Sequence, residues 1–429
     1  MEREILSKTA EVLTDHDLCD FCLGRLFGKL SHGLSNQERG QALKTFLALA
    51  EDRPIEEQKI DAGYCAICQG LFEKLEEMAE VGLNSIGGYE FDSFLIGNRV
   101  PDELEEAQRE IAKGFQITTA ERISRDFNRE VGKLFYSQLN KENAEAQPEQ
   151  NKPDITIVLD PSKKSAEVRV KPVFIYGRYR KEVRGVPQSV WHCPVCGGKG
   201  CQTCDGTGKK YGSSIEELVS EPAMQKCSGA DTAFHGCGRE DVDARMKGEG
   251  RPFVVEIRTP RRRSVDLEDL QRTINEEAEG KISVSPLKMV NKSAVTAVKQ
   301  GRPDKRYRVV VDLARQVSPE KIKSALSELR GEVQQRTPAR VSHRRTDQNR
   351  IRRVKQIRGK KLGDTRYEIT LRTSSGLYVK ELMHSDNGRT KPSLAELLGI
   401  EITVRELDVL EILAKLREQE SGEYQLVPT

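Results

Sequence analysis

The spacing of apolar residues alternates between helical and strand types along the first part of the chain. Amphipathic patterns over Asn36–Ala50 and Thr119–Leu139 predict helices. Strand-type runs occupy Tyr89–Ile96, Ile155–Leu159 and Ala166–Val170. This order of elements predicts a small α/β region in the first 185 residues.

The remainder of the chain mixes strands and helices in a longer α+β pattern. Helices are predicted at Asp266–Ala278 and Pro319–Arg330, because each of these segments begins with an acidic first turn. The predicted strands of this part are Phe253–Arg258, Ile282–Val290, Tyr307–Leu313, Tyr367–Thr373 and Ile402–Leu407.

Length and composition bound the class of protein. A chain of 429 residues has room for about two to three domains, and we divide it into residues 1–85, 86–185 and 186–429, the last with a Cys-rich insertion at 193–208. Lys and Arg number 70 and Asp and Glu 67, so the folded surface carries both signs of charge. No stretch approaches the roughly 18 apolar residues of a membrane span, and the N-terminus lacks a secretory pattern, so a cytoplasmic protein is expected.

Eight of the ten cysteines fall into four Cys-x2-Cys pairs, which is the spacing of structural zinc ligands. One predicted zinc site combines the two pairs that flank the first helix, and the other combines two adjacent tandem pairs. The predicted ligands are Cys19, Cys22, Cys65 and Cys68 for the first site, and Cys193, Cys196, Cys201 and Cys204 for the second. The alternative is that these are reduced cysteines of a core. Four thiolates close the coordination shell, so neither site is expected to be catalytic.

A strongly basic stretch lies between Arg336 and Lys361. It holds eleven Lys and Arg residues and a single acid, Asp347, with His343 beside them. The alternative is that this run simply forms a solvated surface. Because nearly all of its charges are positive in a chain whose charges otherwise balance, it favours contacts with a polyanion.

Three short segments in the second half together resemble the active-site motifs of pseudouridine synthases. They are Gly238-Arg-Glu-Asp241, Lys305-Arg-Tyr307 and Ser375-Gly-Leu-Tyr378-Val-Lys380. The match is with the archaeal and eukaryotic tRNA family that has an N-terminal THUMP-type RNA-binding domain and a four-cysteine zinc site. Further matching segments lie in order along nearly the whole chain: Cys19-Asp-Phe-Cys22-Leu-Gly-Arg, Asn36-Gln-Glu-Arg-Gly, Tyr176-Gly-Arg-Tyr, Pro187-Gln-Ser-Val-Trp191 and Gln335-Arg-Thr-Pro-Ala-Arg-Val-Ser-His-Arg-Arg345.

The resemblance implies a fold and a substrate. The fold is α+β, with a zinc-bearing THUMP-like α/β region followed by a catalytic domain on a mixed, mainly antiparallel sheet. The substrate is tRNA, modified at T-loop uridines, and the enzyme is expected to act as a monomer without a membrane partner.

The resemblance also assigns residues to the reaction. It makes Asp241, rather than Asp243, the catalytic carboxylate, and it places Tyr307 against the base as a catalytic residue whose hydroxyl would serve proton removal at the final step. Breaking the N1–C1′ bond and rejoining the base through C5 requires no redox change, so no cofactor is expected beyond structural zinc. A carboxylate nucleophile must be ionised, and a cation beside it favours that form.

The remaining site residues follow from spacing inside these motifs. Lys380 is the predicted cation for Asp241, because a strand through Tyr378-Val-Lys380 would put Tyr378 and Lys380 on one face. Tyr378 is expected to contact substrate, and Arg239 to clamp a phosphate or fill the place of the extruded base.

Two rival functions remain open at this point. One is another THUMP-type tRNA-modifying enzyme, a methyltransferase or a thiolation enzyme, although we find neither a Gly-x-Gly-x-Gly after a strand nor a phosphate-binding loop. The other is a zinc-dependent RNA-binding protein without activity.

Overall fold

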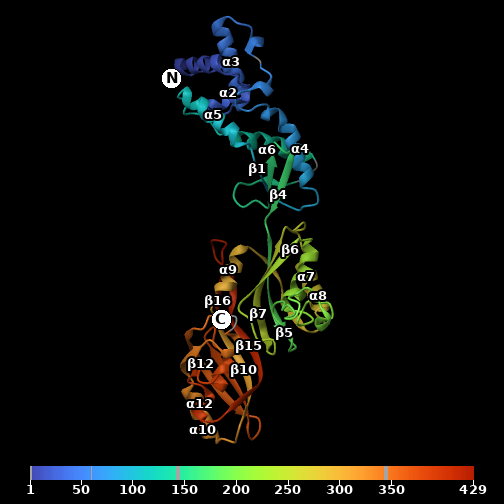
Figure 1. The fold of residues 1–429 in the computed structure, drawn as a ribbon, viewed down its shortest axis with the longest axis vertical. Helices are drawn as coiled ribbons and strands as arrows, with labels where there is room; N and C mark the ends of the chain where they lie inside the picture. The colour runs from blue at the N-terminus through green and yellow to red at the C-terminus, as the bar shows by residue number, and fades with distance from the viewer. Residues whose placement is uncertain (1, 59, 142–144, 343–345) are drawn as a thin grey trace. The chain divides into compact units, whose positions relative to one another are not determined.

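The computed structural model describes residues 2–58, 60–141, 145–342 and 346–429, which fold into two compact units (Figure 1). The first unit spans residues 1–171 and the second 172–429. The predicted segment 86–185 runs past this boundary, because the strand Val173–Lys181 (β5) pairs with a strand of the second unit.

The first unit places helices around a small sheet. Its four strands lie in the order β2-β1-β3-β4, with β1 parallel to β2 and β3 and antiparallel pairing between β3 and β4. The strands are β1 (Ser93–Asn98), β2 (Gln147–Pro148), β3 (Ile155–Asp160) and β4 (Ser165–Val170). The α-helices are α1 (Glu2–Asp15), α2 (Asp20–Leu26), α3 (Asn36–Glu51), α4 (Leu75–Ser85), α5 (Asp102–Gly114) and α6 (Ile123–Lys141).

The second unit is built on one large, mainly antiparallel sheet. The path of hydrogen-bonded neighbours is β14-β11-β12-β13-β10-β15-β7-β5-β8, with β16, β6 and β9 paired beside it. Its strands are β5, β6 (Asp231–Gly236), β7 (Arg245–Arg258), β8 (Ile282–Val284), β9 (Lys288–Val290), β10 (Asp304–Leu313), β11 (Gly331–Arg336), β12 (Asn349–Lys361), β13 (Arg366–Thr373), β14 (Thr390–Lys391), β15 (Ile402–Glu418) and β16 (Tyr424–Pro428).

Six α-helices complete the second unit in the part of it that the structure describes. They are α7 (Ile215–Cys227), α8 (Leu267–Glu277), α9 (Lys292–Gln300), α10 (Pro319–Glu328), α11 (Val379–His384) and α12 (Leu394–Leu398). With helices, a mixed first sheet and this second sheet, the chain has the predicted α+β fold.

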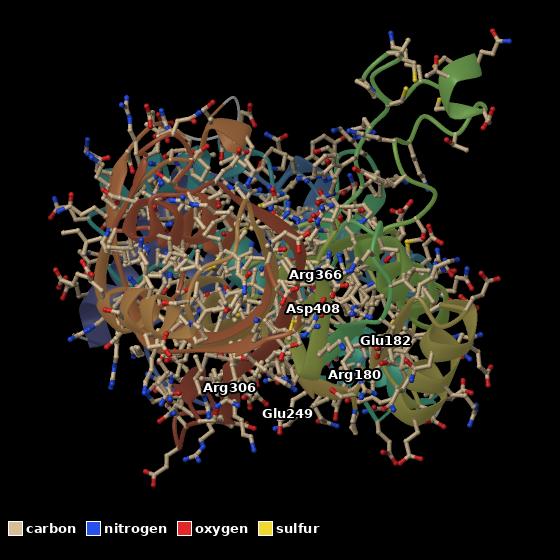
Figure 2. All side chains as sticks on the ribbon, turned by 90° about the horizontal axis from the view of Figure 1, so that it is seen from below. Arg180, Glu182, Glu249, Arg306, Arg366 and Asp408 are labelled. Atoms are coloured by element: carbon tan, nitrogen blue, oxygen red, sulfur yellow. The ribbon has the colours of Figure 1, made fainter. Side chains whose placement is uncertain are left out.

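The two halves of the large sheet meet at one short parallel pairing. There Asp408 and Val409 of β15 lie opposite Arg245 and Met246 of β7. The Asp408 side chain is fully buried and accepts hydrogen bonds from arginines of three other segments, Arg184, Arg245 and Arg308 (Asp408 is labelled in Figure 2). A buried carboxylate needs such partners, so this cluster fixes how the halves join.

Most predicted elements are confirmed, and the differences have local causes. The predicted helix from Thr119 begins only at Ile123, because Thr119 bonds with its carbonyl and hydroxyl groups to Lys29 and Leu26. The predicted strand Ile282–Val290 is broken into β8 and β9 at a segment containing Pro286, which has no N–H to donate. Among the described residues, no helix is both long and apolar enough to cross a bilayer.

Candidate active site

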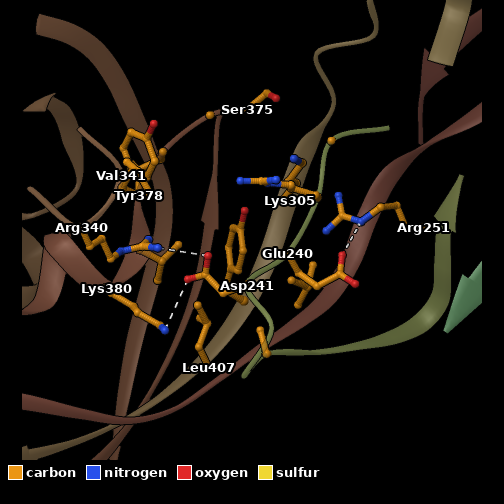
Figure 3. A pocket seen from close by; sticks show the side chains of 18 of the residues that line it. Glu240, Asp241, Arg251, Lys305, Arg340, Val341, Ser375, Tyr378, Lys380 and Leu407 are labelled. Atoms are coloured by element: carbon orange, nitrogen blue, oxygen red, sulfur yellow. Dashed lines mark hydrogen bonds and ion pairs between the residues drawn. The ribbon is translucent and has the colours of Figure 1, made fainter. Parts of the chain in front are cut away.

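A cavity of about 250 Å³ lies beside the parallel junction in the second unit. It is slightly smaller than typical ligand pockets of roughly 300–1,000 Å³. The predicted residues Arg239, Asp241, Tyr307, Tyr378 and Lys380 all line it (Figure 3). Segments more than a hundred residues apart in the sequence therefore converge here.

Asp241 stands between two cations. It lies in the loop between β6 and β7, with about a third of its side chain exposed. Arg340 Nη1 donates a hydrogen bond of 3.1 Å to Oδ1, and Lys380 Nζ lies 3.3 Å from Oδ2. Two positive charges therefore contact the Asp241 carboxylate.

The neighbouring Asp243 differs from Asp241 in its surroundings. It accepts hydrogen bonds of 2.8 and 2.9 Å from Lys380, yet its side chain is two-thirds exposed and does not line the cavity. Burial opposes its ionisation, but the hydrogen bond and charge of Lys380 dominate and lower the pKa of Asp243. Asp243 therefore positions Lys380, while Asp241 faces the cavity.

Tyr307 lies on β10 and lines the cavity. It pairs with Val409 of β15 on one side and Leu371 of β13 on the other, and only 8% of the residue is exposed. Val309, Val311 and Leu313, which follow Tyr307 at every second position of the strand, are buried as well, so this strand face is apolar. Burial raises the pKa of Tyr307 to about 12, so its hydroxyl is protonated at neutral pH.

The predicted strand through Tyr378 and Lys380 is wrong. Tyr378 is the N-cap of helix α11, and Lys380 lies in that helix's first turn. The buried amide of Gln335 fixes the start of this helix, since it accepts from Tyr378 N at 2.8 Å and donates to Tyr378 O at 2.9 Å. Both side chains nonetheless line the cavity, because the turn before the helix faces it.

Arg340 is a site residue that the sequence analysis did not single out. It sits in a 3-10 turn, Ala339–Val341, inside the basic stretch, and its Nε donates a 2.6 Å hydrogen bond to the buried Glu381. Burial disfavours its charge, but the bonds and charges of Glu381 and Asp241 outweigh this and raise the pKa of Arg340. His343, which the sequence analysis placed in the basic stretch, lies with Arg344 and Arg345 outside the described residues.

A buried ionic network supports the loop that carries Asp241. Glu240 accepts a 2.8 Å hydrogen bond from Arg251 Nε, and each side chain is only 1% exposed. Arg251 also donates to the carbonyl of Cys237, and Tyr179 donates its hydroxyl proton to Glu240. Gln188 links Tyr179 to the carbonyl of Gly238. The residues immediately before Asp241 are thus held to strands β5 and β7.

The first cysteine cluster has the geometry of a closed metal site. The four ligand atoms of Cys19, Cys22, Cys65 and Cys68 lie within 4.8 Å of one another, and all four residues are buried. Two of the sulfurs, on Cys19 and Cys68, are 3.6 Å apart, close to the roughly 3.8 Å between ligands of a tetrahedral site with Zn–S bonds of about 2.3 Å. Arg25, fully buried, donates a 3.0 Å hydrogen bond to Cys22 Sγ.

The second cluster has similar distances with more exposure. The sulfur atoms of Cys193, Cys196, Cys201 and Cys204 lie within 4.8 Å of one another, and three of the sulfur pairs are 3.6 to 3.9 Å apart. The backbone amides of Cys201 and Gly208 point at Cys204 Sγ at 3.2 Å. Amide support of this kind is usual around metal-bound thiolates, so both clusters can hold a metal ion.

The family model described as "Pus10, C-terminal" matches residues 174–413, and "Pus10 THUMP domain, archaeal" matches residues 78–160. The protein named tRNA pseudouridine synthase Pus10 from Methanothrix thermoacetophila is 40% identical over 432 residues, covering 95% of this chain and 94% of that protein. Its namesake from Pyrococcus furiosus is 37% identical, covering 95% and 98%. A solved Cbf5-Nop10-Gar1 complex covers 55% of this chain and 49% of that one at 15% identity, with a TM-score of 0.32. On the family models and the sequence relatives, the chain belongs to the Pus10 family of pseudouridine synthases.

Proposed function

We propose that this protein is a tRNA pseudouridine synthase that isomerises T-loop uridine, with Asp241 as the nucleophile. One observation carries the proposal: Asp241, Tyr307 and Lys380 line a single cavity of about 250 Å³. The relatives that match over nearly the full chain are named tRNA pseudouridine synthases.

The paired cations prepare Asp241 for attack. The Asp241 carboxylate attacks C1′ while the N1–C1′ bond breaks and its electron pair leaves with the base. Arg340 and Lys380 hold and orient the carboxylate before this step, because both lie within 3.3 Å of its oxygens. After the base has turned, C5 attacks C1′ and the bond to Asp241 breaks.

Tyr307 serves the base and the final proton transfer. Its ring stacks on the uracil, because it lies on an apolar strand face and lines the cavity. C5 loses a proton in the last step and N1 gains one, so no proton is consumed overall. Because its pKa of about 12 keeps Tyr307 protonated at neutral pH, the phenol relays the proton: its oxygen accepts the C5 proton while its own O–H proton goes to N1.

Arg239 and Tyr378 are proposed substrate contacts at the rim. Arg239 is exposed, lines the cavity and makes no hydrogen bond or ion pair with the rest of the described chain, so its guanidinium is available to a phosphate or to the vacancy left by the extruded uridine. Tyr378 offers a second aromatic surface at the same rim.

The remaining parts bind RNA and hold structure. We assign residues 1–85 to a zinc-bearing segment, the following part to a THUMP-like RNA-binding domain and the last part to catalysis. Structural Zn²⁺ in each cysteine cluster would stabilise the loops that carry the four cysteines, without taking part in the reaction. The protein acts as a monomer in the cytoplasm, where its tRNA substrate is found.

Substitution of Asp241 tests the proposal. Asp241→Ala is expected to bind an unmodified tRNA transcript like the wild type and to form no pseudouridine. Asp243→Asn is the matched contrast: because Asp243 only positions Lys380, it should slow the reaction without abolishing it. Pseudouridine formed by Asp241→Ala would refute the nucleophile, and a wild type that binds tRNA without modifying it would favour the RNA-binding alternative.

A further inference from the structure

Lys305 is a buried cation of the cavity wall, and no described residue serves as its counter-ion. It lies on β10 two residues before Tyr307, so both side chains leave the same face of the strand. The residue is 8% exposed and lines the cavity. Across the described residues its amino group has no hydrogen-bond or ion-pair partner, whereas a buried charge normally has one.

The charges around Lys305 leave a surplus of positive charge. Arg251 on β7 and Arg302 before β10 are positive, and Glu240 is already committed to Arg251 and Tyr179. Burial raises the pKa of the Cys237 thiol, which therefore stays neutral.

The other groups packed against Lys305 do not offset this surplus. Its strand partners, Ile412 on β15 and Thr373 on β13, are uncharged, and Tyr307 keeps its proton. Asp241, the other acidic residue that lines the cavity, already forms ion pairs with Arg340 and Lys380.

The amino group is aimed at the catalytic loop. A Cβ built on Gly238 would lie 3.1 Å from Lys305 Nζ, and Gly238 has a φ of +71°, which favours glycine. Figure 3 shows Lys305 and Arg251 on one side of Asp241, and Arg340 and Lys380 on the other. Arg340 and Lys380 are bound to Asp241, Asp243 and Glu381, so they are not free to neutralise a second anion.

We propose that Lys305 is a further catalytic residue, whose ammonium group stabilises the negative charge on the detached uracil ring. The inference rests on the proposed function. When the N1–C1′ bond breaks, the electron pair stays on the base and its charge spreads over N1, O2 and O4. A fixed cation in a pocket shielded from water stabilises such charge with little reorganisation.

The charge state of Lys305 separates this role from a proton-transfer role. Burial, and then the charge of Arg251, lower its pKa to about 8, so the amine is mainly protonated at neutral pH. If the positive charge is needed, the rate falls as pH rises through about 8. If the neutral amine were a general base, the rate would rise over the same range.

The proposal is tested by the single-turnover rate constant of pseudouridine formation at saturating tRNA transcript. The rate is compared between four full-length proteins: wild type, Lys305→Met, Lys305→Arg and, as a control at an exposed position, Lys299→Met. We expect Lys305→Met to lower the rate constant by about 10²–10³-fold while the Kd for tRNA changes less than about threefold. Lys305→Arg should keep much of the wild-type rate, and this rate should not fall as the pH rises through about 8, because arginine stays protonated. Lys299→Met should match the wild type.

Other results overturn the inference. A Lys305→Met rate close to that of wild type would exclude a catalytic role, and a weaker Kd with an unchanged rate would indicate a phosphate contact instead. If Lys305→Met does not bind tRNA, the pH profile of Lys305→Arg decides, since a decline equal to that of wild type contradicts the proposal. A wild type that forms no pseudouridine removes the proposed function, and this inference with it.

Discussion

The buried pair of Glu240 and Arg251 offers a quantitative test of how the active-site loop is held. Glu240→Gln keeps the size of the side chain and its ability to bind the Tyr179 hydroxyl, but it removes the negative charge. Arg251 would then carry an uncompensated charge at 1% exposure. Breaking a buried pair by removing one partner costs about 3–5 kcal/mol.

The expected loss is measurable by an intrinsic probe. The chain has a single tryptophan, Trp191, which belongs to the second unit. A domain of comparable size loses roughly 2–4 °C in Tm for each kcal/mol of stability lost. The Tm of Glu240→Gln, followed by Trp191 fluorescence, should therefore be lower than that of wild type by on the order of 10 °C. Arg251→Met alone should cost a similar amount, because it leaves Glu240 uncompensated.

The double variant decides whether the two charges are coupled. Glu240→Gln with Arg251→Met removes both charges, so it should be several kcal/mol more stable than the sum of the single losses predicts. Single variants within about 1 kcal/mol of wild type, or strictly additive losses, would refute the argument that this pair holds the loop.

Three further predictions concern the buried lysine, the metal clusters and Tyr307. The pKa of Lys305 falls from 10.5 to about 8 on folding, so the unfolded chain binds more protons than the folded chain between these pH values. The unfolding free energy of Lys305→Met should therefore exceed that of wild type by up to about 3 kcal/mol at pH 7. This difference should vanish as the pH rises towards 10.5. A difference independent of pH would contradict this sign. Elemental analysis should find two zinc ions per chain, and Cys22→Ser and Cys196→Ser should each lose one; unchanged metal content would exclude these ligands. Tyr307→Phe should keep tRNA binding and slow single-turnover chemistry by about 10²–10⁴-fold, as expected for proton transfer, whereas an unchanged rate would leave Tyr307 with stacking alone.

Local sequence patterns were sufficient for part of the site. The resemblance to pseudouridine synthase motifs pointed to Asp241, and the alternating apolar residues from Tyr307 to Leu313 predicted the strand that carries Tyr307. The cysteine quartets could be predicted from spacing, since two Cys-x2-Cys turns supply a complete tetrahedral set. In these cases the necessary information lies within a few residues.

Other features depend on contacts that no local pattern contains. A short run such as Tyr378-Val-Lys380 fits a strand or a helix start, and the amide of Gln335, 43 residues away, fixes the helix start. Arg340 belongs to a run predicted to bind a polyanion, and only the fold brings it to Asp241, 99 residues away in sequence. Lys305 could not be recognised as unpaired before its neighbours were known.

The most direct measurement of the central claim is a map of pseudouridine in an unmodified tRNA transcript incubated with the purified chain and no added cofactor. We predict that pseudouridine appears at T-loop uridines with wild type and is absent with Asp241→Ala. Pseudouridine that forms equally with Asp241→Ala, or a transcript that wild type binds and leaves unmodified, would contradict the account.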